Sequence, residues 1–437
     1  MPQIARPKYL QELIDRIGNG LIKVITGLRR SGKSYLLNEI FVKYLKSIGI
    51  KDRQIIQFDF SNANDLKLIG EDYIEIKKDN RKVDPNKFLN YIEKTIIKNK
   101  KYFLLLDEVQ ELGGFEYVLN GYLSDGNFDI FVTGSNAKFL SKDVITEFRG
   151  RGDEIHVLPL SFSECWRFYD SDPKKALDKY LIFGGLPLAV LAKSDEARIE
   201  YIDSQIKETY IADVLERYGS RNENELNDLF HFIASSTSSL INPKKLADRF
   251  KSIKNSSLSE FTIASYIDHF EDVFLIKKAF RYDIKGTRYI STPYKIYFED
   301  VGLRNSVLEF RQNELNHIME NVVYNELRYR GYKIDVGQVE YRETIIDSKT
   351  NQPKQIKKFL ETDFVINKGS ARAYIQSAYN IDDKEKREHE ILSLKNINDS
   401  FKKIVIVNNY PFDGYDDNGI YYLDFYRFLS NENSLNL

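Results

Sequence analysis

Two glycines, a lysine and a serine near the start of the chain have the types and spacing that binding of a polyphosphate requires. Residues 27–34 read GLRRSGKS, which contains the pattern GxxxxGK(S/T). The two glycines permit backbone angles and close approaches that a Cβ atom would obstruct. Lys33 would reach the β- and γ-phosphates, and Ser34 would offer its hydroxyl to Mg²⁺. We therefore predict an ATP-binding loop with the contact residues Gly27, Leu28, Arg29, Arg30, Ser31, Gly32, Lys33, Ser34 and Tyr35.

The segments on either side of this loop favour phosphate binding over a chance glycine-rich turn with a solvated lysine. Leu21–Thr26 is an apolar, β-branched run of strand length, and Tyr35–Leu45 repeats apolar residues at helical spacing. A strand, a glycine-bounded loop and a helix thus follow one another in the order that the chemistry needs. The loop N–H groups and the positive end of the helix dipole would both face the phosphates.

Two adjacent carboxylates form the second candidate site. Tyr102–Glu108 reads YFLLLDE, and its uninterrupted apolar run is typical of a strand buried on both faces of a parallel sheet. The acids stand at the strand end, where a parallel sheet presents its ligands. Asp107 would hold Mg²⁺, usually through water, and Glu108 would polarise the attacking water. The alternative is that the two acids cap the following helix.

The bulk composition excludes several classes of protein. The 437 residues are too many for one core, so we expect about two to four domains. The formal net charge of −1 gives no global attraction to nucleic acid or anionic lipid. The single cysteine, Cys165, excludes an intramolecular disulfide and a cysteine-rich metal cluster. With no apolar run of bilayer length and no signal peptide, we expect a cytoplasmic protein that does not enter a membrane.

Further motifs make a family resemblance specific. GLRRSGKS, LLLDEVQ, TGSNAKFLS, FRGR followed by LPLSF, and GGLP at Gly184–Pro187 follow one another in this order. Over essentially its whole length the chain resembles the bacterial and archaeal AAA-type ATPases that carry a winged helix and a restriction-endonuclease-like C-terminus. The resemblance implies an α/β fold: an AAA-type P-loop NTPase parallel sheet, then a helical connector, a winged helix and a degenerate restriction-endonuclease-like α/β domain. The expected boundaries are 1–161, 162–225, 226–310 and 311–437.

Polar residues beyond the next strand complete the predicted nucleotide site. Phe128–Thr133 is a further buried strand, and the resemblance places it between the P-loop strand and the strand of the paired acids. Asn136 is our first choice for the side chain that senses the γ-phosphate, and Ser135 is the second. Arg149 and Arg151 lie in a glycine-flexible loop, where an arginine could stabilise transition-state charge on a neighbouring subunit's nucleotide. We favour Arg151; a solvated loop arginine is the alternative.

The segment 226–310 has the pattern of a winged helix-turn-helix. Helices over Leu226–Ser236, Pro243–Phe250 and Ser259–Phe274 precede two predicted wing strands. Such modules commonly place their last helix in the DNA major groove. Here that helix carries four acids and no lysine or arginine, so phosphates would repel it. DNA contact and protein–protein docking both stay open as roles for this region.

The order of elements after residue 311 is that of a restriction-endonuclease-like core. Active members hold Mg²⁺ with a helix glutamate, an aspartate on the second strand and an E/QxK triplet on the third. The matching positions here are Glu320, Asp363 and Gln376, and Ala378 stands where the triplet carries its lysine. We therefore expect no cation for activating water, weak Mg²⁺ affinity and an inactive nuclease fold. Glu320 also fits a solvated position near the edge of its helix's apolar face.

These residues together predict a cytosolic ATPase that hydrolyses ATP with Mg²⁺, with catalysis carried by Lys33, Glu108, Asn136 and Arg151. Its nucleotide state would reposition the winged helix and the nuclease-like module. The candidate partners are DNA, another protein and further copies of the chain. The alternatives are a nucleotide-gated switch or scaffold with slow hydrolysis, an ATP-dependent DNA nuclease, and a small-molecule kinase, for which no acceptor-binding lid is recognisable.

Overall fold

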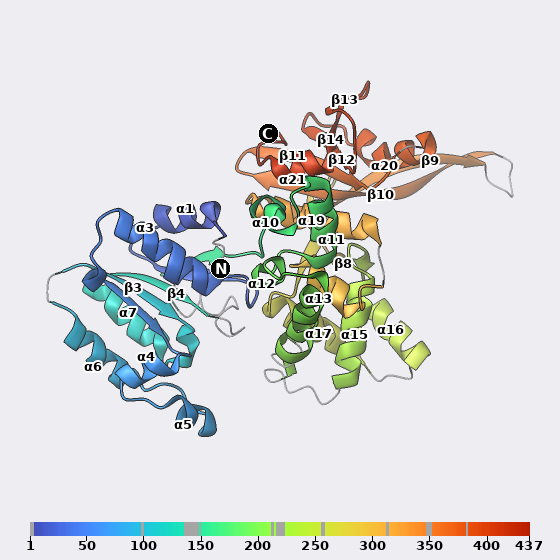
Figure 1. Cartoon of the computed structure of the whole chain (residues 1–437). Coiled ribbons are helices and arrows are strands. Elements are labelled where there is room, and N and C mark those ends of the chain that lie inside the picture. The colour runs from blue at the N-terminus through green and yellow to red at the C-terminus, as the bar shows by residue number, and fades with distance from the viewer. Residues whose placement is uncertain are drawn as a thin grey trace. The chain divides into compact units, whose positions relative to one another are not determined.

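The chain folds into two compact units, coloured along the sequence in Figure 1. This computed structural model describes residues 4–97, 100–134, 148, 150–210, 214–215, 223–254, 258–311, 314–346, 352–381 and 383–437. The first unit is Met1–Pro159 with Asp272–Phe274, and the second is Leu160–Glu271 with Leu275–Leu437. The change of unit after Pro159 lies next to the domain boundary expected at 161. The boundaries expected at 225 and 310 fall inside the second unit and stay predictions.

The first unit is built on a five-stranded sheet in the order β2-β3-β4-β1-β5. All four strand pairs are parallel. Apolar runs that are buried on both faces form its central strands, as expected for a sheet covered by helices on each side. The order places β4 between β1 and β3, and the predicted α/β fold with a parallel P-loop sheet is confirmed. The strands are β1 (Ile22–Thr26), β2 (Ile55–Asp59), β3 (Tyr102–Asp107), β4 (Phe128–Thr133) and β5 (Gly152–His156).

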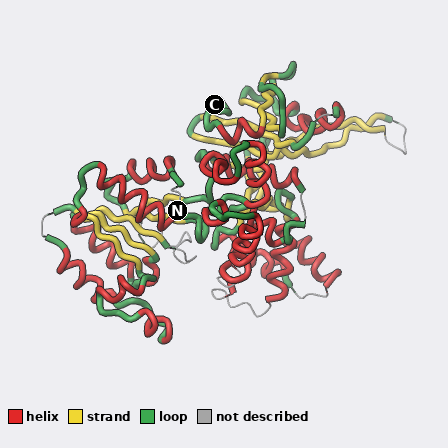
Figure 2. The backbone as a smooth tube through the Cα atoms, viewed as in Figure 1, coloured by secondary structure: helices red, strands yellow, loops and turns green. Residues whose placement is uncertain are grey.

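Helices lie on both faces of this sheet (Figure 2). One hydrophobic core joins buried side chains of β2, β3 and β4 to those of α6 and α7. A π-helical turn, Leu36–Phe41, connects α2 to α3, so these segments form one continuous helical stretch after the glycine-rich loop. The helices are α1 (Pro7–Asp15), α2 (Lys33–Tyr35), α3 (Val42–Ser47), α4 (Ala63–Leu68), α5 (Tyr73–Lys78), α6 (Pro85–Thr95) and α7 (Phe115–Asp125).

The second unit contains a nine-stranded mixed sheet in the order β13-β14-β12-β11-β10-β9-β7-β8-β6. The wing strands predicted at Phe280–Tyr289 and Tyr294–Phe298 have other bounds in the structure, because the first of them spans the turn between β7 and β8. Both β7 and β8 belong to this sheet, since β7 pairs in parallel with β9. The wing and the predicted nuclease-like core therefore share one sheet, and β9 with β10 extends from it as a ribbon (Figure 1). The strands are β6 (Leu240–Ile241), β7 (Ile276–Asp283), β8 (Arg288–Phe298), β9 (Lys333–Ile346), β10 (Pro353–Lys368), β11 (Ala371–Ala378), β12 (Lys402–Val407), β13 (Gly414–Tyr415) and β14 (Ile420–Asp424).

Helices surround this second sheet. The predicted helices at 226–236, 243–250 and 259–274 are present as α15, α16 and α17. No helix among the described residues has both the length and the apolar character that crossing a bilayer requires. The helices are α10 (Phe162–Tyr169), α11 (Pro173–Phe183), α12 (Pro187–Val190), α13 (Asp195–Ser204), α15 (Glu223–Ser235), α16 (Pro243–Lys254), α17 (Glu260–Asp272), α18 (Val301–Val307), α19 (Leu315–Tyr329), α20 (Lys384–Lys395) and α21 (Phe425–Ser430), with a π-helical turn at Gln205–Tyr210.

A buried carboxylate fastens the GGLP motif to helix α18, all of whose residues are buried. Asp300 caps α18 by accepting a hydrogen bond from Leu303 N at 3.1 Å, and it also accepts one from Gly185 N at 2.6 Å. Burial raises the pKa of Asp300 to about 6, although these backbone hydrogen bonds oppose the shift. A Cβ atom at Gly184 would lie 2.1 Å from Asp300 Oδ1, so this position accepts glycine alone.

Gly185 supplies a test of this packing. A Cβ atom there would lie 2.1 Å from Leu160 O, a backbone atom that cannot rotate away. We expect Gly185→Ala to lower the free energy of unfolding of the second unit by about 1–3 kcal/mol, as overpacking does elsewhere. The fluorescence of Trp166, the single tryptophan, reports unfolding of this unit. Gly414→Ala is the control, because a Cβ atom there meets nothing within 4 Å; equal stability of the two variants would contradict the packing argument.

Candidate functional site

The glycine-rich loop at residues 27–34 joins β1 to α2 in a tightly curled conformation. Gly27 has φ 131°, and a Cβ atom there would lie 2.2 Å from Val157 O. Gly32 precedes α2 with φ 96°, and Arg30 also lies in the left-handed region with φ 63°. Left-handed residues alternating with ordinary ones direct successive N–H groups to the concave side of a loop. The backbone angles at Gly27 and Gly32 thus require glycine at both positions, as the sequence pattern indicates.

The Lys33 ammonium lies against the carbonyl groups of this loop. Lys33 is buried, and its Nζ donates hydrogen bonds to Gly27 O and Leu28 O, each at 3.0 Å. Ser31 is fully buried, and its hydroxyl has no hydrogen-bond partner among the described residues. A concave loop with inward N–H groups, a lysine at its rim and an unmatched hydroxyl has the donors that a polyphosphate accepts from.

Asp107 connects the end of β3 to the loop that follows β1. The Asp107 carboxylate accepts hydrogen bonds from Thr133 Oγ1 and, at 3.3 Å, from Asn38 Nδ2, and the Ser34 hydroxyl lies near it. Burial raises the pKa of Asp107, and the neighbouring Ser34 and Thr133 hydroxyls oppose that rise. The structure therefore brings the two predicted metal-binding residues, Ser34 and Asp107, together at the carboxyl edge of the sheet.

Glu108, the predicted water-positioning residue, occupies a strained backbone position. Its φ of 50° and ψ of 44° are left-handed, a conformation that costs a non-glycine residue about 1–2 kcal/mol. Its N–H donates to Asp107 Oδ1 at 3.1 Å, and its carboxylate accepts a hydrogen bond from Gln110 Nε2. Such strain concentrates at functional sites, where the surrounding structure holds it. The strain and the two hydrogen bonds fix the second carboxylate directly beside the first.

Of the remaining predicted catalytic residues, Arg151 is among the described residues, and it is not at this edge. Asn136, Ser135 and Arg149 lie outside the described residues. Arg151 is exposed and directly precedes β5, which pairs with β1 in the register Ile22↔Gly152. Arg151 is therefore at the amino ends of these strands, about 16 Å along the strand direction from the loop that follows β1. Within one chain it does not reach the glycine-rich loop.

Arg6, which the sequence reasoning missed, braces the loop from α1. Its NH1 donates to Ser31 O at 3.1 Å and its NH2 to Leu158 O at 2.7 Å, and it is buried. Its guanidinium lies 4.6 Å from the ring centroid of Tyr9, whose hydroxyl accepts from Leu158 N at 3.0 Å. An arginine in front of a proline-initiated helix has no motif, so no sequence signal identified it.

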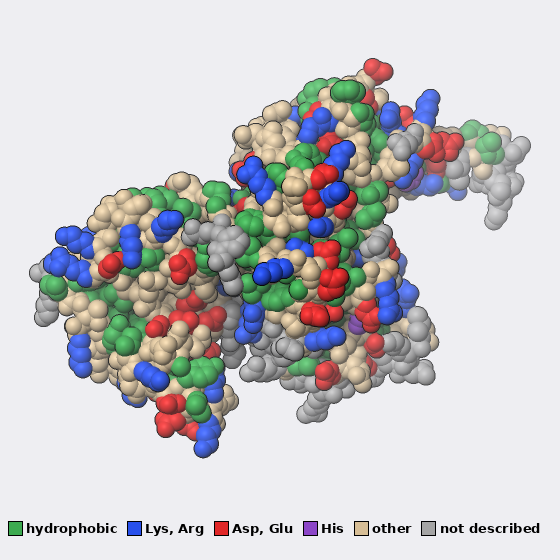
Figure 3. All heavy atoms as spheres, viewed as in Figure 1, with side chains coloured by type: hydrophobic (Ala, Val, Ile, Leu, Met, Phe, Trp, Pro, Cys, Tyr) green, Lys and Arg blue, Asp and Glu red, His purple; other side chains and the backbone are tan. Residues whose placement is uncertain are grey.

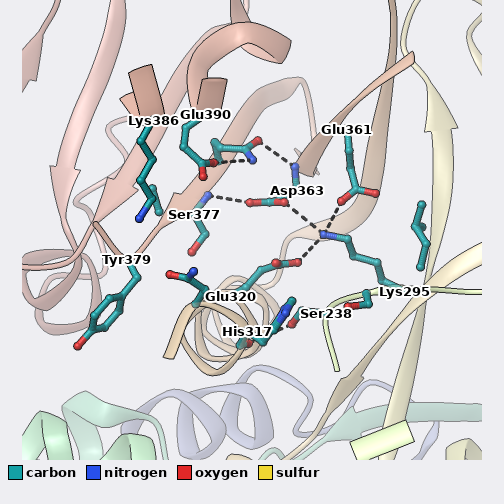
Figure 4. A pocket seen from close by; sticks show the side chains of 15 residues that line it. Ser238, Lys295, His317, Glu320, Glu361, Asp363, Ser377, Tyr379, Lys386 and Glu390 are labelled. Atoms are coloured by element: carbon teal, nitrogen blue, oxygen red, sulfur yellow. Dashed lines mark hydrogen bonds and ion pairs between the residues drawn. The ribbon is translucent and has the colours of Figure 1, made fainter. Parts of the chain in front are cut away.

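A second polar centre contains the predicted nuclease-like residues and lines a pocket of about 420 Å³ in the second unit (Figure 4). Glu320 is on α19, Asp363 on β10 and Gln376 on β11. Two expectations are wrong. Glu320 is buried, not solvated, with 8% of its surface exposed. A cation is present although Ala378 replaces the triplet lysine, because Lys295 of β8 contacts Glu320 at 2.7 Å and Asp363 at 3.2 Å.

Sequence spacing could not have revealed Lys295, which lies 25 residues before Glu320 and 68 before Asp363 in the segment assigned to the wing. Glu361 also contacts Lys295, at 2.8 Å. A signal for Glu361 did exist, because residues two apart on a strand share a face, and Asp363 was already identified.

Comparisons with known proteins match two parts of the chain to family profiles and nearly the whole chain to two relatives. A family profile described as an AAA domain matches residues 19–166, and a profile described as a domain of unknown function matches residues 174–314. An uncharacterized protein of Haemophilus influenzae is 33% identical over 414 residues, covering 93% of this chain and 94% of that protein. An uncharacterized protein of Methanocaldococcus jannaschii is 30% identical over 417 residues, covering 90% of this chain and 83% of that protein.

Two solved structures align with this chain at low identity and low TM-score. The Aeropyrum pernix ORC1 protein, solved in complex with DNA, is 12% identical with a TM-score of 0.32, covering 70% of this chain and 93% of that chain. The Aeropyrum pernix ORC2 protein, solved in ADPNP–ADP complexes, is 13% identical with a TM-score of 0.34, covering 75% of this chain and 96% of that chain. At these scores we take nothing about function from either protein.

The brace on the loop gives a prediction that needs no ligand. Arg6→Ala leaves the buried carbonyl groups of Ser31 and Leu158 without their donor, so we expect the free energy of unfolding of the first unit to fall by about 1–3 kcal/mol. Circular dichroism would show the loss, while the Trp166 fluorescence transition of the second unit stays in place. Arg53→Ala, at an exposed position, is the control. An unchanged circular dichroism transition in Arg6→Ala would refute the brace.

Proposed function

We propose an ATPase function on the premise that the chain belongs to the same protein family as its relatives from Haemophilus influenzae and Methanocaldococcus jannaschii, and that its residues 19–166 are an AAA domain. The observation that supports the proposal is the proximity of the Ser34 hydroxyl to the Asp107 carboxylate, whose pKa the hydroxyl lowers against the effect of burial. It joins the glycine-rich loop to the paired carboxylates, two motifs that lie far apart in the sequence. A loop that binds phosphate and an acid that binds a metal ion have to meet in this way for hydrolysis to occur.

The side chains of this edge fit ATP and Mg²⁺. Hydroxyl and carboxylate oxygens, as in Ser34 and Asp107, are the ligands that Mg²⁺ takes together with substrate phosphates and water. The buried Ser31 hydroxyl, unmatched among the described residues, and the inward N–H groups of the loop supply donors to phosphate oxygens. The raised pKa of Asp107, which results from burial, would fall again when a cation lies beside it.

Each residue of the edge then has one role. Bound ATP supplies the phosphoanhydride to be cleaved, and bound Mg²⁺ offsets the phosphate charge. Lys33, now hydrogen-bonded to the loop carbonyls, holds positive charge at the loop rim, and Ser34 with Asp107 holds the metal ion. Glu108 orients the water that attacks, from its fixed left-handed position. We also propose that Asn136 contacts the γ-phosphate.

We propose that Arg151 acts on the nucleotide of a neighbouring copy. Its exposure and its position in front of β5, at the edge opposite the glycine-rich loop, support a role between chains over one within a chain. An arginine supplied in trans stabilises transition-state charge in related chemistry. Mass measurement with and without a non-hydrolysable ATP analogue tests the association that this role requires.

Nucleotide state, in this proposal, is transmitted to the second unit. DNA contact there is better supported for α16 than for α17. The exposed Lys244 and Lys245 lie on α16, whereas the acids of α17 are engaged with lysines of β7, as in the 3.1 Å ion pair between Glu271 and Lys278. Phe261 of α17 is 86% exposed, which supports protein docking on that helix.

The overall charge does not decide between these partners, since both signs are interspersed over the visible faces (Figure 3). The salt dependence of binding separates the two, because phosphate contacts release counterions and protein docking through an apolar side chain does not.

Lys33→Ala tests the site assignment. The substitution removes the positive charge at the loop rim, so we expect ATP binding to be abolished, as measured by titration with a fluorescent ATP analogue. Lys43→Ala is the control, because Lys43 is exposed on the helical stretch that follows the same loop. Wild-type affinity in Lys33→Ala, with Lys43→Ala unchanged, would show that the site is assigned to the wrong residues.

Glu108→Gln separates binding from hydrolysis. The amide keeps the shape of the side chain but cannot accept a proton from water, so we expect ATP affinity near that of the wild type and turnover lower by about 10²–10⁴-fold. Phosphate release under multiple-turnover conditions measures this, with Glu116→Gln of α7 as the control. A wild-type enzyme that releases one phosphate per site in a burst and then stalls would favour the nucleotide-gated switch over a steadily cycling ATPase.

A further inference from the structure

The second polar centre is organised around one buried ammonium group. Lys295 of β8 is 2% exposed, and its Nζ contacts one carboxylate oxygen each of Glu320 at 2.7 Å, Glu361 at 2.8 Å and Asp363 at 3.2 Å. Figure 4 shows the three carboxylates converging on the ammonium from different directions. The lysine comes from β8, one acid from α19 and two from β10. The pocket is thus a cation site made of side chains from three separate elements.

The ammonium is engaged by all three acids. It donates hydrogen bonds to Glu320 Oε1 and Asp363 Oδ1, and Glu361 adds an ion pair at 2.8 Å. The acids themselves are held in place from outside this contact. Tyr297 OH donates to Glu320 Oε1 at 2.7 Å, and Ser377 N donates to Asp363 Oδ2 at 2.9 Å. Carboxylates anchored in this way form a preorganised cage rather than a chance surface ion pair.

Electrostatics keep the lysine charged inside the pocket. Burial alone would lower the pKa of Lys295, but the carboxylates of Glu320, Asp363 and Glu361 outweigh burial and hold it well above its ordinary value. Burial also raises the pKa of Glu320 to about 8, with Asp363 adding to the shift. Near neutral pH the ammonium of Lys295 therefore stays charged.

We propose that Lys295 is the resident cation of this pocket: its ammonium occupies the place where the carboxylates of Glu320, Glu361 and Asp363 would otherwise hold a divalent metal ion. A divalent ion bound by the same oxygens would lie within a few ångströms of the ammonium, in surroundings that screen their repulsion poorly. The pocket is consequently closed to divalent ions while the lysine is present, and removal of the lysine opens it to one.

Two further observations agree with this proposal. As they are placed around the ammonium, Glu320, Glu361 and Asp363 do not form a metal site, and neither does any other group of three or more histidine, cysteine or acidic residues in the described part of the chain. Lys295 donates hydrogen bonds to Glu320 and Asp363 and pairs with Glu361, so an incoming phosphate oxygen would have to displace one of these acids. We still expect an inactive nuclease fold, but for a different reason. The lysine missing at Ala378 does not leave the centre without a cation, because Lys295 fills the cation position. The ammonium also connects the wing strand β8 to the nuclease-like elements α19 and β10.

Lys295→Met tests the proposal, with Mn²⁺ as the probe and the full chain free of nucleotide. Methionine keeps most of the volume of the lysine and removes its charge. We expect the variant to gain one Mn²⁺ site by electron paramagnetic resonance, with an affinity at least about 100-fold above any binding by the wild type at this pocket. Mn²⁺ should also raise the unfolding temperature reported by Trp166 in the variant, and leave that of the wild type unchanged.

Two controls assign the gained site to the pocket. Lys295→Met combined with Asp363→Asn should bind Mn²⁺ at least about tenfold more weakly than Lys295→Met, because one of the three ligands becomes an amide. Lys278→Met should gain no site, since among the described residues Lys278 pairs with two acids, Asp268 and Glu271, and not with a third. If Lys295→Met does not fold, Lys295→Met with Glu320→Gln leaves one buried carboxyl group fewer, and we expect it to fold and to bind Mn²⁺ at least about tenfold more tightly than the wild type at this pocket.

Two outcomes would overturn the proposal. A wild-type chain that binds Mn²⁺ with an affinity lost in Asp363→Asn would show that the lysine and a metal ion coexist in the pocket. Mn²⁺-dependent cutting of supercoiled DNA, lost in the same variant, would extend that result to an active nuclease. A folded Lys295→Met chain that gains no Mn²⁺ site would show that the carboxylates form no cation cage. None of these results depends on ATP hydrolysis by the first unit.

Discussion

A charge taken out of water has to meet opposite charge or hydrogen bonds, and this constraint determines how both polar centres are built. An unpaired buried ion costs several kcal/mol, which is a large part of the stability of a domain. In the first unit the Asp107 carboxylate meets the constraint with donors from β4 and from the helical stretch after the glycine-rich loop. One buried acid, Asp107, thus connects the elements at this edge of the sheet, and the glycine-rich loop, Lys33 and Glu108 lie around it.

The second unit meets the same constraint by the opposite arrangement, in which one buried base gathers several acids. Lys295 holds Glu320, Glu361 and Asp363, so elements that the sequence assigns to different modules share one ion cluster and one sheet. The buried Asp300 carboxylate also connects separate segments, but through backbone donors. Gly185 and Leu303 supply the hydrogen bonds that a solvated carboxylate would take from water. These contacts explain why the second unit is compact although its predicted modules differ in kind.

The parts of the structure that local chemistry decides could be predicted from the sequence. Strands such as β3 and β4 are buried on both faces, so an apolar run alone identifies them. The loop before Lys33 depends on glycines at fixed spacing, because the backbone angles at Gly27 and Gly32 exclude most other residues. Lys295 could not be predicted, since its partners follow 25 and 68 residues later and meet it through the sheet order β8-β7-β9-β10.

The two buried lysines show why residue type alone does not assign a function. Lys33 donates to the carbonyls of Gly27 and Leu28, which carry no net charge and compete weakly with an anion for its ammonium. Lys295 donates to the carboxyl groups of Glu320 and Asp363 and forms an ion pair with Glu361, so an incoming phosphate would have to displace acidic partners. Lys33 can therefore exchange these hydrogen bonds for hydrogen bonds to a ligand, whereas Lys295 remains paired with its acidic partners. The two lysines therefore differ in function because the fold gives them different partners, which are neutral carbonyl groups for Lys33 and carboxyl groups for Lys295.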